Sequence, residues 1–136
     1  MISAKDELVQ SWMIKAGRDL RSAAELSAAS PPLLDTAAYH CQQAAEKALK
    51  GFLVFHDIRF DKTHDIEVLL SQASTIDRAF SSWASAAGLL TPLAVEYRYP
   101  GAFAEPEPDE FKEAYESASQ LFAFVLERLP DIVKPK

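Results

Sequence analysis

Four polar residues suited to recognising phosphate and base groups recur within AAYHCQQAAEKALKGFLVFH, residues 37–56. They follow one another at steps of three or four: His40, Gln43, Lys47 and Lys50. At about 100° per residue they would share one stripe of a helix. Two ammonium groups, an imidazole and an amide could then bind a phosphate and the edge of a base. A solvated helix face is the alternative, and the spacing leaves both interpretations open.

Gln42 and Glu46 lie one helical turn apart on a flank of the apolar side of the same stretch. Burying a polar side chain without a partner costs about 1–3 kcal/mol. Both residues therefore need partners, for which Arg98, Tyr97 and His64 have matching chemistry.

A second candidate binding group is Arg98, which stands between two tyrosines in EYRYPG, residues 96–101. An arginine beside aromatic rings can stack on them and donate charged hydrogen bonds to phosphate or carboxylate. A structural arginine paired with Glu46 or Glu96 is the alternative.

No metal or cofactor site is predicted. Di-iron bundles need two Glu-x-x-His pairs, and three scattered histidines with one cysteine do not give zinc spacing. The sequence also lacks a phosphate-binding glycine loop and a nucleophile elbow. Cys41, among alanines, is expected to be a small core residue.

The elements that must position these residues are expected to be helices, because the chain has only 4 glycines and lacks β-branched runs. Ser3 is the predicted cap of a first helix that ends before SPP, residues 30–32. Asp35 is the predicted cap of a second helix that runs to about His56. Its apolar residues advance by alternating threes and fours, which predicts close packing against neighbouring helices.

A short helix is expected over residues 66–73, capped by Thr63 or Asp65. A third long helix is expected over residues 76–99, kinked or broken near Gly88 and Pro92. Asp109 is the predicted cap of the last helix. The prediction is an all-α, up-and-down four-helix bundle with one additional short helix, forming a single domain over residues 1–136.

Composition and charge limit the kinds of partner and the cellular location that can be expected. The 136 residues include 14 basic and 20 acidic side chains, a formal charge of −6, so binding of RNA would have to be local. Charged residues near the amino terminus leave no room for a signal peptide, and no apolar run is long enough to span a membrane. A cytoplasmic protein is expected.

Three segments, in this order, resemble the HEPN family: AAYHCQQAAEKALKGFLVFH, KTHDIEVLL and LAVEYRYPG, preceded by AGRDLRSAAEL. The resemblance covers residues 15–129. It implies a bundle of four or five helices, usually a homodimer, associated with nucleotide or RNA binding. It also implies a nucleotidyltransferase partner, in the manner of a toxin–antitoxin pair.

The resemblance implies a set of site residues that would converge in a polar pocket. They are His40, Gln43, Glu46, Lys47, Lys50, His64, Tyr97 and Arg98. Several members of the wider family resemble metal-independent ribonucleases that use an arginine and a histidine separated by four to six residues. Here the positions following Arg98 at that spacing hold Phe103, Ala104 and Glu105, so the acid–base histidine is missing.

Three hypotheses follow. The first is a non-catalytic dimeric module that binds nucleotide or RNA phosphate, a nucleotidyltransferase partner, or both. The second is a ribonuclease, and the third is a structural dimerisation scaffold. Large apolar residues in excess of what one small bundle conceals also suggest a dimer: Trp12, Trp83, Phe103 and Phe124.

Overall fold

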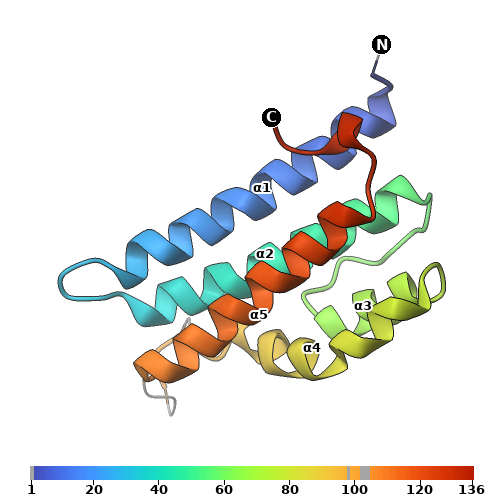
Figure 1. The fold of residues 1–136 in the computed structure, drawn as a ribbon. Coiled ribbons are helices and arrows are strands. Elements are labelled where there is room, and N and C mark those ends of the chain that lie inside the picture. Colours follow the sequence, from blue (N-terminus) through green and yellow to red (C-terminus); the bar gives the residue numbers. More distant parts are fainter. Residues whose placement is uncertain (1, 98, 102–104) are drawn as a thin grey trace.

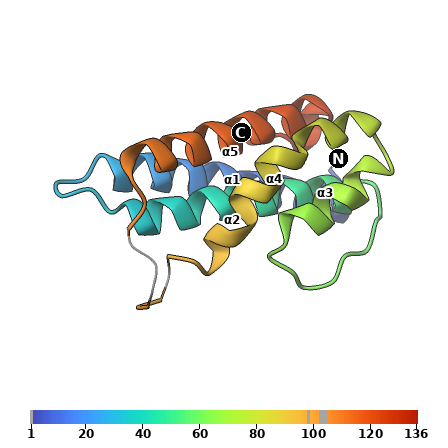
Figure 2. The same ribbon diagram turned by 90° about the horizontal axis from the view of Figure 1, so that it is seen from below.

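The fold is known from a computed structural model that describes residues 2–97, 99–101 and 105–136. Every regular element in these residues is helical, which confirms the all-α prediction. The α-helices are α1 (Ala4–Ser27), α2 (Leu34–Phe55), α3 (Ile66–Ser74), α4 (Ala84–Leu90) and α5 (Pro108–Glu127). Short 3₁₀ helices cover Arg78–Trp83, Thr91–Ala94 and Asp131–Val133. The helices α1, α2 and α5 run alongside one another, and α3 and α4 lie across them on one side (Figure 1, Figure 2).

The helix α2 is the centre of the molecule. Its alanines and Cys41 are buried against α1 and α5, as the alternating apolar spacing predicts. Gly51 lies at a close contact with α1, because a Cβ added there would stand 2.9 Å from the sulfur of Met13. Burial raises the pKa of the Cys41 thiol to about 12, as befits a core residue.

Two of the helix caps predicted from the sequence are present in the structure. Ser3 caps α1, where its hydroxyl accepts the N–H of Asp6 at 3.0 Å. Asp65 caps α3 and accepts the N–H of Glu67 at 2.9 Å, while Thr63 accepts the N–H of Asp65. Both predicted caps are therefore confirmed, and of the two residues proposed for α3 it is Asp65 that caps the helix.

Two other predicted caps are wrong. The residue before the first turn of α2 is Leu33, not Asp35, and the Leu34 N–H donates to Glu105 at 3.2 Å. A side chain distant in the sequence thus satisfies the end of this helix. At α5 the cap position is Glu107, whose N–H donates to Glu110, so Asp109 lies inside the first turn.

The predicted long helix over residues 76–99 is confirmed only in part: it is broken near Pro92, as expected, but residues 76–83 are not α-helical. Asp77 caps the 3₁₀ helix Arg78–Trp83 by accepting the N–H of Ala79. The α-helix begins only at Ala84 and ends at Leu90, shortly before Pro92, which lacks a backbone N–H. Gly88 lies within α4 and does not break it. This bent segment lets α3 and α4 cover one side of α2.

Aromatic rings fill the core beside the end of α2. Phe80 packs between Phe52 and Phe124, with ring centroids 4.6 Å and 5.0 Å away. Trp83 packs on Phe124 at 5.2 Å. Two of the large residues that suggested a dimer surface therefore contact each other inside one chain.

Candidate functional site

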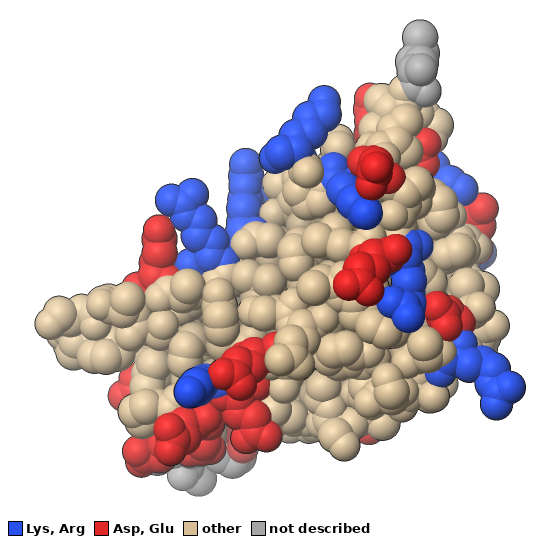
Figure 3. Space-filling model, in the orientation of Figure 1, with Lys and Arg blue, Asp and Glu red and all other residues tan. Residues whose placement is uncertain are grey.

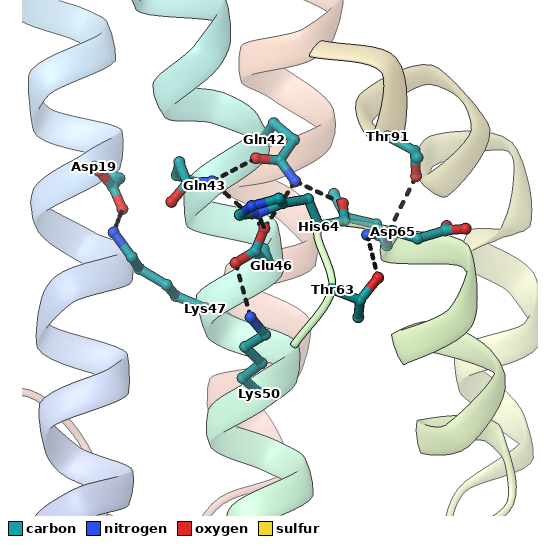
Figure 4. Close-up of polar contacts among 11 residues, drawn as sticks. Asp19, Gln42, Gln43, Glu46, Lys47, Lys50, Thr63, His64, Asp65 and Thr91 are labelled. Carbon is teal, nitrogen blue, oxygen red and sulfur yellow. Dashed lines mark hydrogen bonds and ion pairs between the residues drawn. The ribbon is translucent and has the colours of Figure 1, made fainter. Parts of the chain in front are cut away.

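A buried carboxylate in the middle of α2 collects most of the polar contacts. The Glu46 side chain is only 5% exposed. Its Oε1 accepts hydrogen bonds from the Nε2 atoms of Gln42 at 3.0 Å and Gln43 at 3.4 Å. Gln43 also donates to the Gln42 oxygen at 2.7 Å. Figure 4 shows these side chains gathered on one face of α2.

Lys50 supplies the opposite charge. Its Nζ donates to Oε2 of Glu46 at 2.9 Å, and its side chain is only 10% exposed. The ammonium also lies 5.8 Å from the ring centre of Trp12 and 5.6 Å from that of Phe60. Aromatic faces attract a desolvated cation, so the rings and the carboxylate together offset the loss of water.

His64 joins the loop before α3 to this cluster. Its Nδ1 lies 2.8 Å from Oε1 of Glu46, and its backbone oxygen accepts a hydrogen bond from Gln42 at 2.9 Å. A carboxylate only accepts, so Nδ1 carries the hydrogen in this contact. The ring is 65% exposed, which leaves the imidazole accessible to solvent.

The charge state of Glu46 follows from these contacts. Burial by itself would raise the pKa of Glu46, but hydrogen bonds from His64, Lys50 and Gln42 outweigh it. The pKa of Glu46 therefore lies below its usual value, and the carboxylate stays ionised at neutral pH. Of the partners expected for this residue, His64 is the one that contacts it in the described part of the chain.

A second cluster joins α2 to α1 through Asp19, which is buried. One carboxylate oxygen of Asp19 lies 2.8 Å from Nδ1 of His40, and the other accepts a hydrogen bond from Lys47 at 2.6 Å. His40 and Lys47 are 26% and 23% exposed at their side chains. Sequence reasoning missed Asp19, since a lone aspartate in a helix is common on a solvated face.

The predicted stripe on α2 is thus shared between two carboxylates. His40 and Lys47 contact Asp19, whereas Gln43 and Lys50 belong to the Glu46 cluster. The stripe is a largely buried seam rather than a solvated face.

A cleft of about 290 Å³ opens beside the Asp19 cluster. Its walls come from the start of α2 and from the segment after Ala94: Asp35, Thr36, Tyr39, His40 and Tyr97. Partial burial, with smaller contributions from Glu110 and Glu96, raises the pKa of Tyr97, so its phenol stays neutral and can donate a hydrogen bond. Tyr97 therefore faces this cleft and is not among the contacts of Glu46.

Two further expectations concern the same region. Arg98, Phe103 and Ala104 lie outside the described residues, so their place relative to the cleft is not assigned. Within the described residues, no three His, Cys, Asp or Glu side chains are grouped so as to hold a metal ion. The described helices include none that is both long and apolar enough to cross a membrane.

Both the sequence and the architecture are similar to those of known proteins. The HEPN domain matches residues 9–129. The chain belongs to the HEPN family. It is similar in structure to TT1696 from Thermus thermophilus, with a TM-score of 0.80 and 26% identity over 90% of this chain and 99% of that one. It is also similar to ST0689, an archaeal HEPN homologue, with a TM-score of 0.69 and 27% identity over 88% and 96%. No curated protein matches the sequence significantly.

Membership of the HEPN family confirms the resemblance inferred from the sequence segments. The two polar clusters lie inside the matched range, so they belong to the HEPN domain itself. The cleft at the start of α2 lies in the same range, and His40 of the stripe forms part of its wall.

Proposed function

We propose that this HEPN protein is a non-catalytic, dimeric module that binds a nucleotide, or a ribose-phosphate unit of RNA, in the cleft beside His40. One observation supports the proposal most: Asp19 contacts Nδ1 of His40, and the same imidazole forms part of the cleft wall. A carboxylate on one ring nitrogen fixes the ring and leaves Nε2 for a ligand.

The other walls of the cleft suit the remaining parts of a nucleotide. Tyr39 and Tyr97 offer aromatic surface on which a base can stack. Asp35 and Thr36 offer a carboxylate and a hydroxyl at the first turn of α2, where ribose hydroxyls could be bound. We place the phosphate beside His40, whose Nδ1 is held by Asp19 and whose Nε2 stays available.

The contacts also distinguish the two lysines that were expected to bind phosphate. Lys47 is partly exposed and shares Asp19 with His40, so it stays in the proposed binding set. Lys50 is held by Glu46 in a buried pair, and freeing it for a ligand would leave that carboxylate unpaired. We therefore assign Lys50 to the structure of the domain and not to phosphate binding.

Calorimetric titration tests the proposal with AMP, ATP and a short single-stranded RNA. We expect wild-type protein to bind at least one of them and His40→Ala to weaken that binding about tenfold or more, because the ring that contacts the ligand is lost. The exposed Arg78→Ala variant is the control and should bind as wild type does. Absence of binding by the wild type, or equal binding by His40→Ala, would contradict the proposal.

Incubating the same RNA with the protein, without metal, separates this proposal from the ribonuclease alternative. A binding module leaves the RNA intact. Cleavage that disappears in Arg98→Ala would establish the ribonuclease instead.

A further inference from the structure

An apolar groove lies between α1 and α5. Its volume is about 630 Å³. The floor is formed by Ile14 and Gly17 of α1 and by Phe122 and Leu126 of α5. These residues are partly buried, and Pro135 near the carboxyl end also lines the groove.

Basic residues border this floor at both ends. Arg18 and Arg21 of α1, together with Lys134 and Lys136 near the carboxyl end, line the groove. On the face seen in Figure 3, Lys and Arg side chains stand along the edge formed by α1, whereas Asp and Glu side chains gather over the start of α5. The groove thus joins an apolar floor to a positive border in a molecule whose net charge is −6.

The basic residues of the border form only weak ion pairs with acidic neighbours. Glu25 lies 3.3 Å from Arg21, and Asp131 lies 3.1 Å from Lys134, but both carboxylates are well exposed. Exposed pairs of this kind contribute about 0–1 kcal/mol. Carboxylates of a ligand could therefore replace them at little cost, and among the residues that the structure describes no acidic side chain lines the groove itself.

Gly17 is the unusual residue of the floor. A glycine within a helix is less favourable than alanine, because it loses more backbone freedom on folding. The fold does not require it, since its φ is not positive and an added Cβ would lie in ordinary contact, 3.7 Å from Cζ of Phe122. The missing side chain leaves the ring of Phe122 accessible from outside.

We propose that this groove receives an acidic amphipathic helix from a partner protein. An apolar stripe at helical spacing would contact Phe122 and Leu126, and carboxylates on its flanks would pair with Arg18 and Arg21. Gly17 would allow the backbone of the incoming helix to approach closely.

Charge complementarity selects this occupant over the alternatives. A second copy related by a two-fold axis would place the positive border against itself, which is repulsive. A nucleic acid would gain from the four cations but not from the apolar floor. The proposal is independent of the nucleotide cleft, which lies at the start of α2.

Selection from an unbiased library tests the proposal. Random helical peptides of about 18 residues, roughly five turns, are displayed on phage and panned against the wild-type protein. We expect enriched sequences to carry carboxylates flanking apolar residues spaced three and four apart. Synthetic peptides of these sequences are then measured by fluorescence anisotropy.

Two variants locate the site. Arg18→Glu/Arg21→Glu reverses exposed charges, and Gly17→Leu fills the floor. Each should weaken peptide binding about tenfold or more. The matched control Arg59→Glu/Arg78→Glu reverses two exposed charges elsewhere and should bind within about twofold of the wild type. Melting temperatures confirm folding, and Gly17→Ala replaces Gly17→Leu if leucine lowers stability.

Several results would overturn the proposal. They are a panning that enriches nothing, enriched peptides without carboxylates, and equal binding by the groove variants. Pelleting of wild type but not Arg18→Glu/Arg21→Glu with phosphatidylglycerol vesicles would assign the groove to an anionic lipid surface. A change in the sedimentation of the groove variants alone would assign it to a second copy of this chain.

Discussion

Two buried carboxylates, Asp19 and Glu46, each hold one histidine through Nδ1 and one lysine. They differ in which partner reaches solvent. At Glu46 the lysine is enclosed and the histidine is exposed, whereas at Asp19 both partners are partly exposed. The same chemistry can therefore serve stability at Glu46 and leave groups available to a ligand at Asp19.

Glu46→Gln is expected to lower the free energy of unfolding by about 3 kcal/mol at pH 7, because it leaves the charge of Lys50 buried without a counter-charge. Urea denaturation measures the loss. The control Glu25→Gln removes an exposed carboxylate and should cost less than about 0.5 kcal/mol. If Glu46→Gln proves as mild as this control, the buried pair does not stabilise the fold.

The same variant has an expected pH dependence. Because the folded pKa of Glu46 lies below its unfolded value, the ionised carboxylate stabilises the protein above that unfolded value, 4.5. This stabilisation is lost as the pH falls through the folded pKa. The stability difference between wild type and Glu46→Gln should therefore shrink as urea denaturation is repeated from about pH 6 towards pH 3. A difference that stays constant over this range would contradict the assignment.

The sequence predicted which residue types gather at the site, but not that they form two separate clusters around Asp19 and Glu46. His64 could be named in advance, alongside Arg98 and Tyr97, as a candidate partner of Glu46, because a buried polar side chain needs a partner. Asp19 could not, since the side of α1 that faces α2 is fixed only when the two helices pack. The burial of Lys50 was missed for the same reason: Trp12 and Phe60, which enclose it, come from other segments.

At the scale of elements, the contact between α1 and α2 depends on Gly51. Alanine there should lower the free energy of unfolding by about 1–3 kcal/mol, despite its better helix propensity. The added Cβ would lie 2.9 Å from the Met13 sulfur and 3.1 Å from the Trp12 Cβ, and Met13 is fully buried, so neither can move freely.

Gly88→Ala is the matched control for this prediction. Gly88 lies in α4, and an added Cβ would meet no atom within 4 Å beyond the local backbone of its own helix, so alanine should stabilise the protein by about 0.5–1 kcal/mol. Thermal and urea unfolding compare the two variants. A Gly51→Ala variant as stable as Gly88→Ala would show that helix propensity outweighs packing at Gly51.

Helices could be predicted well from the sequence where one apolar pattern repeats over the whole element, as in α2. They were predicted poorly where several short helical segments follow one another with the same apolar spacing. Residues 76–99 have helical spacing throughout, yet Asp77 and Pro92 divide them into 3₁₀ and α segments. Asp77 is held by Arg128 at the end of α5, a contact that local spacing does not encode.

At the scale of the whole molecule, the homodimer stays a prediction drawn from the HEPN family. Trp83 and Phe124 pack together and no longer indicate a second copy. Sedimentation equilibrium at micromolar concentration should nevertheless give twice the chain mass of 15.0 kDa. A single species of the monomer mass would contradict the prediction, whatever the outcome of the ligand titrations.

The hydrogen bond from Leu34 to Glu105 has a consequence for the growing chain. The first turn of α2 is completed by a side chain 71 residues further on. A nascent chain that has released only α1 and α2 from the ribosome can pair these helices, but the Leu34 N–H at the beginning of α2 is then bound by water and not by Glu105. That end is held by Glu105 only when the segment leading into α5 arrives, so the wall of the cleft at Asp35 and Thr36 is finished late in synthesis.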